Sequence, residues 1–374
     1  MRKVLSFAVG VGLLAAVAFS PLQVSGEKAI PLPTGFIANS ITWMTPRHGW
    51  ILGSAPCNGH SCTDVITSTD SGATWALLGT VPAPLEQHAY PSFGVTEIRF
   101  MSSSVGWAYG TSLYLTTNGG VTWKAQPIPG GAHHVVALAT TTTASYVIVS
   151  SCKFNTGLSC QKPLALFRRG AKVAVWKKVS LALPMSLEAG LALHGSSVYV
   201  WDQLLDSGAP DRLYASTDGI HFIARTAPCD HAKDVALVDV VATSAQNLDM
   251  LCDGNPGFSK AEKTVYRSNN MAKSETYAGM LPPYGIQAQL AASASGSLAV
   301  ASFSDGTFMD YNDGTGTKWT RVIASGDGGV GWNDIAFTTN SVAWVVYGPD
   351  EYPGKLGIVL VTHDAGHHWK PVEL

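Results

Sequence analysis

Three carboxylates are the first candidates for chemistry in this chain of 374 residues: Glu97, Asp239 and Asp334. When the chain's similar segments are aligned, these acids fall in one column, which reads Ile41, Glu97, Val136, Gly190, Asp239, Gln289 and Asp334. If the column faces a common opening, its acids could hold a cation or accept hydrogen bonds from a polyol. Two of them could also hydrolyse a glycoside, at a separation of about 5–5.5 Å for retention or about 6.5–9.5 Å for inversion. Glu86 and Asp202 are further candidates for such a pair.

A structural role explains the same column. An acid that recurs at one position of a repeat often accepts hydrogen bonds from backbone groups of neighbouring units. Arg99 lies two residues after Glu97, on the same face of an extended strand, so the two side chains could simply pair. Both interpretations stay open at this level, and Arg99 is a candidate binding residue under the first.

Aromatic side chains are the other candidates for binding. If they are exposed, Tyr90, Trp201, Trp332 and Tyr352 could stack on sugar rings or anchor a protein partner. Packing in the core or at the rim explains them equally well. The histidines are scattered over separate loops, and their spacing does not bring three or four together, so we predict neither a metal site nor a cofactor.

A recurring segment shows which elements must position these residues. Ser68–Trp75 (STDSGATW) returns as Thr116–Trp123 (TTNGGVTW) and as Thr362–Trp369 (THDAGHHW). In each copy a short acceptor closes a turn, glycine supplies a positive φ, and tryptophan anchors the following strand by burying a large ring. The residues in these roles are Asp70, Gly72 and Trp75, then Asn118, Gly120 and Trp123, and finally Asp364, Gly366 and Trp369.

Degenerate copies fill the intervals between these three. Asp218 lies in a copy that is one residue short, and Asp313 lies in a copy that is one residue long. Phe167–Trp176 and Tyr266–Asn270 occupy the two remaining places without the full signature. A polar turn followed by an apolar run precedes each copy and also occurs seven times. Short β-rich runs bounded by Gly, Ser, Asn and Pro indicate an all-β chain, and we predict a seven-bladed β-propeller of four-stranded antiparallel blades.

The recurring segment resembles the Asp-box, or bacterial neuraminidase repeat. Sialidases are similar in this box, but none of the nine arginines here is followed by Ile-Pro, so their catalytic residues cannot be transferred. The units, with Phe100–Gly110 and Thr116–Trp123 as the best copy, are most similar to the seven-bladed photosystem II assembly factors of the Ycf48 family. That resemblance implies a non-enzymatic scaffold for assembling membrane proteins.

The ends and the composition suggest an exported protein. Met1-Arg2-Lys3 followed by the apolar run from Val4 to Phe19 is typical of a secretory signal. We assign residues 1–26 to the signal peptide, 27–34 to a linker and 35–374 to one propeller, with a retained N-terminal anchor as the alternative. The formal net charge is −2 and charged residues make up 13 % of the chain, which does not suit a nucleic-acid partner.

The propeller prediction selects one pairing of the six cysteines. Cys57 pairs with Cys62, Cys152 with Cys160, and Cys229 with Cys252, all on the face opposite the recurring turns. A metal site made of Cys57, His60 and Cys62 is the alternative for the first pair, and an oxidising compartment favours the disulfide. Long loops gather on the disulfide face, so we expect the binding surface there.

These observations predict the following function. The chain is an exported, monomeric, non-catalytic propeller of the cell envelope that binds a protein or a cell-surface glycan as a scaffold. It has no stable membrane span. The alternative is a glycoside hydrolase with a carboxylate pair at the channel mouth.

Overall fold

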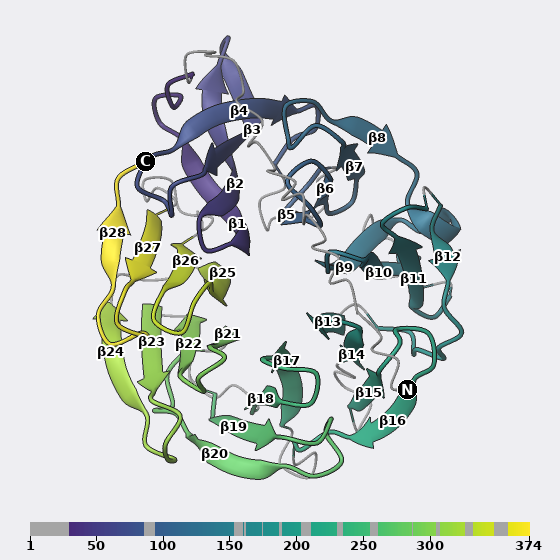
Figure 1. Cartoon of the computed structure of the whole chain (residues 1–374), viewed down its shortest axis with the longest axis vertical. Helices are drawn as coiled ribbons and strands as arrows, with labels where there is room; N and C mark the ends of the chain where they lie inside the picture. The colour runs from purple at the N-terminus through teal and green to yellow at the C-terminus, as the bar shows by residue number, and fades with distance from the viewer. Residues whose placement is uncertain are drawn as a thin grey trace, which may run out of the picture.

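Seven four-stranded antiparallel sheets stand in a ring around a central axis (Figure 1). Within each sheet the strands follow one another in sequence order from the axis to the rim, so each sheet is one blade of a propeller. The seven-bladed all-β prediction is therefore confirmed. The computed structural model describes residues 30–85, 94–152, 160, 162–173, 175–186, 189–202, 211–229, 235–254, 261–285, 287–303, 307–325, 332–347 and 358–374.

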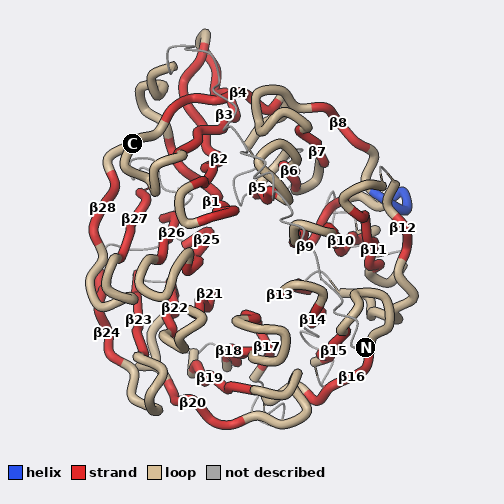
Figure 2. Tube along the Cα trace, in the orientation of Figure 1, coloured by secondary structure: helices blue, strands red, loops and turns tan. Residues whose placement is uncertain are grey.

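Every blade uses four consecutive strands (Figure 2). Blades 1 and 2 are β1–β4 (Ile37–Thr45, His48–Cys57, His60–Ser68, Ala76–Val81) and β5–β8 (Glu97–Phe100, Gly106–Tyr109, Leu113–Thr116, Lys124–Gln126). Blades 3 and 4 are β9–β12 (His134–Thr140, Ala144–Ser150, Ala165–Gly170, Lys177–Lys178) and β13–β16 (Ala189–His194, Ser197–Asp202, Arg212–Ser216, Ile223–Thr226). The short 3-10 helix Pro129–Gly131 connects blades 2 and 3.

The remaining three blades follow the same order. Blade 5 is β17–β20 (Ala236–Ala242, Leu248–Asp253, Lys263–Ser268, Thr276–Met280). Blade 6 is β21–β24 (Gln287–Ala292, Leu298–Phe303, Thr307–Asn312, Thr320–Ser325). Blade 7 is β25–β28 (Trp332–Phe337, Ala343–Tyr347, Ile358–Thr362, Lys370–Val372).

Antiparallel order divides the connections between two faces. Those from the first to the second strand and from the third to the fourth emerge on one side, which we call the turn face. Those from the second to the third strand, and from each blade to the next, emerge on the other side, which we call the loop face. The three predicted disulfides are present and lie on the loop face: Cys57–Cys62, Cys152–Cys160 and Cys229–Cys252.

The recurring segments form nearly identical turns between the third and fourth strands. In blade 1 the Ser68 hydroxyl accepts a hydrogen bond from the Gly72 N–H (2.8 Å) and donates one to Asp70 (2.7 Å). Asp70 in turn accepts from the N–H and the hydroxyl of Thr74, and these bonds lower its pKa to about 2. The corresponding backbone bond recurs at Asn118, Asp218 and Asp364, which accept the N–H groups of Thr122, His221 and His368.

Two of the degenerate turns differ from the sequence alignment. Blade 5, without the full signature, still forms the whole turn, because Asn270 accepts N–H groups from Lys273 and Ser274. In blade 6 the extra residue shifts the frame, so Asp313 stands one position too early and only accepts locally from Thr315. The side chain of Asn312, which ends β23, closes this turn instead by bonding to Gly314, Gly316 and Lys318.

Side-chain packing closes the ring, because blades 1 and 7 share no strand. The Trp43 ring lies 4.8 Å from that of Trp344 in blade 7, and Trp75 meets Trp344 edge-on at 6.2 Å. Both ends of the described chain join this seam: Leu32 and Leu374 pack against the same cluster, and the Leu77 N–H donates to the Ile30 carbonyl (3.1 Å). The tryptophan of the blade 1 turn is thus a wedge between two blades, as predicted.

Gly72 provides a test of this seam. Its φ is +80°, and a Cβ there would overlap the Trp344 indole, whereas Gly59 has a φ of +83° with nothing within 4 Å of a Cβ. Both alanine variants incur backbone strain of about 1 kcal/mol. We expect Gly72→Ala to lower the free energy of unfolding by about 1–3 kcal/mol more than Gly59→Ala, because only the former displaces the indole. Urea denaturation measures the difference, and equal losses would contradict the seam.

Candidate functional site

A cavity of about 410 Å³ occupies the channel at its loop-face end, where the innermost strands begin. One part of its wall is polar and belongs to blades 2, 5, 6 and 7. The opposite part is apolar and belongs mainly to blades 3 and 4. The polar wall consists of Glu97, Arg99, Tyr109, Asp239, Gln289 and Asp334, and the apolar wall includes Val136, Leu138, Leu191 and Trp201.

β-bulges in four innermost strands correct the sequence column. In blades 5 and 7 the residue after the bulge is Asp239 or Asp334, as aligned. In blades 1 and 3 it is Ser40 and Ala137, one residue away from the Ile41 and Val136 of the alignment. A bulge adds a residue to one strand only, so it shifts the alignment of that strand by one residue.

Three of the residues at the corrected position bond to the next blade. Asp239 accepts the N–H of Leu290 in blade 6 (2.8 Å), and Asp334 accepts that of Ile41 in blade 1 (3.1 Å). The Ser40 hydroxyl accepts the N–H of Ile98 in blade 2 (3.1 Å). The structural interpretation of the recurring acids is therefore correct for Asp239 and Asp334.

Arg99 connects three blades at the channel wall. Its Nη2 donates to Glu97 (2.8 Å) and to Asp334 of blade 7 (2.9 Å), so the predicted pair with Glu97 exists within a larger network. Its Nη1 donates to the Ser40 hydroxyl (3.2 Å) and to the Ile98 carbonyl (2.8 Å). Ser40 completes the network by donating to Asp334 (2.6 Å).

Electrostatics make this network strong. Burial opposes the charge of Arg99, but the Asp334 and Glu97 carboxylates outweigh burial and raise the pKa of the guanidinium well above its usual value. Burial also raises the pKa of Tyr109, whose hydroxyl donates to Glu97 (2.6 Å). Asp239 receives only the N–H groups of Leu290 and Val240 and no ion pair from the described residues, and burial raises its pKa to about 6.

These bonds bear on the hydrolase alternative. Glu97 and Asp334 flank one guanidinium nitrogen, which lies between the two carboxylates where a substrate or water would have to sit. Asp239 uses both oxygens for backbone N–H groups. Asp202 is fully buried at the end of β14 and does not line the cavity, and Glu86 lies outside the described residues. Asp239 and Asp334 thus join neighbouring blades, and Glu97 is held by Arg99 and Tyr109 of its own blade.

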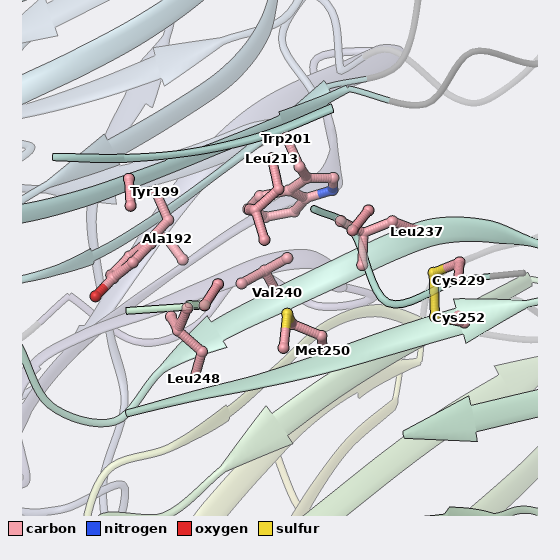
Figure 3. Close-up of a cluster of buried hydrophobic side chains, with 13 residues drawn as sticks. Ala192, Tyr199, Trp201, Leu213, Cys229, Leu237, Val240, Leu248, Met250 and Cys252 are labelled. Carbon is pink, nitrogen blue, oxygen red and sulfur yellow. A yellow bond between two sulfur atoms is a disulfide. The ribbon is translucent and has the colours of Figure 1, made fainter. Parts of the chain in front are cut away.

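The predicted aromatic platform is wrong for Trp201. Only 7 % of this residue is exposed, and its ring packs over Gly190 and against a cluster with Leu213 and Leu237 (Figure 3). The missing side chain at Gly190 leaves the space that the indole fills, so Trp201 forms part of the core and of the cavity wall. Tyr90 and Tyr352 lie outside the described residues, as does the side chain of Trp332 at the start of β25.

A buried charged cluster on the loop face was not predicted from the sequence. Lys263 is fully buried, and its ammonium donates to the carbonyls of Ala261 (3.2 Å), Tyr284 (3.2 Å) and Gly285 (2.6 Å). Asp253 lies 3.7 Å from it, and burial raises the pKa of Asp253 to about 7 while lowering that of Lys263. These bonds hold the connection between blades 5 and 6 against the end of blade 5.

A second pair continues this cluster into blade 6. The Nε and Nη2 groups of Arg321 both donate to the Asp310 carboxylate (3.0 and 2.9 Å), and the guanidinium lies 4.8 Å from the Tyr284 ring centroid. At the first hairpin of the same face, Cys57 and Cys62 are joined in a disulfide beside His60, so neither sulfur is a thiolate ligand. Covalent and ionic contacts therefore both fix the bases of loop-face connections.

Comparison with known proteins finds similarity at the level of fold. No family model matches the chain, and no curated protein matches it. Among solved structures, Ycf48 from Cyanidioschyzon merolae aligns with a TM-score of 0.57 and 14% identity over 90% of this chain and 98% of that chain. A structure of Ycf48 bound to D1 peptide gives a TM-score of 0.54 and 17% identity, over 90% and 96%.

Enzymes share the same fold. Oligogalacturonate lyase from Vibrio parahaemolyticus aligns with a TM-score of 0.58 and 9% identity, over 89% of this chain and 92% of that chain. Fold similarity thus includes both a peptide-binding propeller and a lyase, so it leaves open whether this chain is an enzyme. The part of the chain that the structure describes contains no helix with the length and apolarity that a bilayer crossing requires.

Arg99 should be essential to ring stability. Arg99→Met leaves Glu97 and Asp334 beside each other without their common cation, so we expect the free energy of unfolding to fall by about 2–4 kcal/mol. Arg47→Met, at an exposed arginine of blade 1, is the matched control and should change it by less than about 0.5 kcal/mol. Thermal and urea unfolding report both values, and similar losses in the two variants would contradict the network.

Asp239 should make stability depend on pH. The pKa of Asp239 is about 6 in the folded protein, above its ordinary value of 3.8. The folded state therefore binds this proton more tightly than the unfolded state does. Protonated Asp239 thus stabilises the fold, and this stabilisation is lost as pH rises through 6. Relative to Asp239→Asn, the wild type should therefore gain about 1 kcal/mol of unfolding free energy between pH 7.5 and pH 5. Paired urea titrations measure this gain. A constant difference between the two proteins would show that Asp239 titrates normally.

Proposed function

We propose that this protein is an exported, non-catalytic propeller that binds a protein partner through its loop face. The observation that carries the proposal is the construction of that face. Three disulfides and the buried Lys263 cluster fix its connections around the channel mouth, while Asp239 and Asp334 each accept a backbone N–H of the next blade. A rigid frame with loops on one face suits binding, because little order has to be gained when a partner docks.

The comparisons support a protein as the partner. Ycf48, which shares the seven-bladed fold at low identity, has been captured with a peptide of D1. A glycan ligand at the cell surface is the second class that this chain could bind, but Trp201, one of the aromatics predicted for stacking, is buried. We therefore favour a protein of the cell envelope, which the chain would hold as an assembly or binding scaffold.

The proposed export has its own support. The N-terminal residues have the charge and apolar pattern of a secretory signal, and all six cysteines are paired. Disulfides persist in oxidising compartments, so a chain with three of them suits the extracytoplasmic side of a membrane.

Photo-crosslinking from both faces tests the proposal. A photoreactive amino acid replaces exposed His60 or Glu262 on the loop face, and exposed Ala73 or Lys318 on the turn face serves as the matched control. After irradiation in detergent-solubilised envelope extract, we expect discrete protein adducts from the loop-face positions only. Mass spectrometry then identifies the partner.

Two results would contradict the scaffold. Equal protein adducts from the two faces, or none from His60 and Glu262, would remove the loop face as the binding surface. Turnover of chromogenic glycosides by the wild type that is abolished in Glu97→Gln or Asp334→Asn would establish the hydrolase instead.

A further inference from the structure

Charge is distributed unevenly along the chain. From Ile98 to Leu187 there is no aspartate or glutamate in 90 residues, while this stretch holds nine lysines and arginines. All 26 acidic residues lie elsewhere, together with 15 basic ones. The acid-free stretch contains blade 2 except for Glu97, together with all of blade 3, and it ends just before β13 of blade 4. One sector of the ring is therefore basic.

Exposed aliphatic side chains gather next to this charge on the turn face. The turns between the third and fourth strands of blades 2, 3 and 4 carry Val121 (50 % exposed), Val173 (44 %), Val175 (65 %) and Ile220 (47 %), and Ile223 (60 %) begins the fourth strand of blade 4. The strands that follow these turns, β8, β12 and β16, succeed one another along the rim in Figure 1. We call these five residues the aliphatic arc.

The other blades differ at the same turns. Among the described residues, none of the exposed large hydrophobic side chains lies in the corresponding turns of blades 1, 5, 6 and 7. Blade 1 has Gly72 and Ala73 there, and blade 5 has Ala272, which is buried. Tyr277 (51 % exposed) lies beyond the turn, within β20 of blade 5. Among the described residues, exposed aliphatic side chains at these turns are therefore confined to three adjacent blades.

Lysines flank the arc. Lys172, Lys177 and Lys178 are exposed around the blade 3 turn, and Lys124 is exposed on β8; no ion pair joins any of them to a carboxylate of the described residues. Blade 3 also lacks the Asp or Asn that closes the other turns. In the blade 4 turn, Asp218 accepts the Ile220 N–H and bonds to the His221 ring.

We propose that the aliphatic arc docks the propeller on an anionic lipid surface. The valine and isoleucine side chains would enter the interface while the lysines contact the headgroups, a combination that stabilises peripheral binding. The aliphatic groups stand on separate turn tips of one face, and a fluid interface can surround each tip. This docking turns the loop face away from the lipid, so a partner can reach it, but it does not depend on that partner.

Vesicle flotation tests the docking with the full chain. We compare phosphatidylglycerol–phosphatidylcholine vesicles with phosphatidylcholine alone, for the wild type, Val175→Asp/Ile220→Asp and Lys172→Gln/Lys177→Gln/Lys178→Gln. Met280→Asp/Ile358→Asp is the control, because both residues are similarly exposed (46 and 41 %) outside the arc. We expect the first two variants to bind anionic vesicles at least about tenfold more weakly than the wild type and the control. Salt should weaken wild-type binding as well.

The wild type and all variants have the same apolar N-terminal residues, which could also bind vesicles. Vesicle binding through those residues would be equal on both kinds of vesicle and in all variants. If all of the observed flotation is of this kind, the proposal is overturned. The proposal is also overturned if the wild type binds polyglutamate but no anionic vesicle, which would make an acidic protein the occupant. Circular dichroism and urea unfolding confirm that the surface variants fold.

Discussion

The structure depends on closing a ring whose first and last blades share no strand. One guanidinium does much of this work: Arg99 of blade 2 reaches across Ser40 of blade 1 to Asp334 of blade 7. A cation with several fixed donors can satisfy carboxylates from two blades at once, which a single backbone bond cannot do. The tryptophans between blades 1 and 7 pack together in an apolar cluster, so the Arg99 network and this cluster both hold the two blades together.

Local chemistry explains why so much of the fold could be predicted. Each recurring turn is determined by a few adjacent residues, so residues such as Asp70, Gly72 and Trp75 predict it from the sequence. Seven such units then predict seven blades. Contacts between distant residues leave no such trace. Arg99 and Asp334 are 235 positions apart, and nothing in either segment indicates the other. The bulge before Ser40 was likewise not predicted from the sequence, and it moves the aligned position from Ile41 to Ser40.

Burial was the other quantity that the sequence could not supply. Tryptophan is a residue type that often binds ligands. Gly190, the residue opposite Trp201, leaves space for its ring, so the ring packs into the wall of the cavity. Lys263 would be assigned to the surface on type alone, and three backbone carbonyls make its burial possible. The described part of the candidate site is therefore one end of a channel in which Asp239 and Asp334 join neighbouring blades.

The two ends of the described chain meet at one joint. Ile30 bonds along the outer strand of blade 1, and Leu32 shares its contacts with Leu374. Any mechanical load that enters through the N-terminal segment, from a retained anchor or from a tethered cargo, would reach the wall between the first and last blades before any other part of the ring. A pulling force on the N-terminal segment would therefore act directly on the contact between blades 1 and 7.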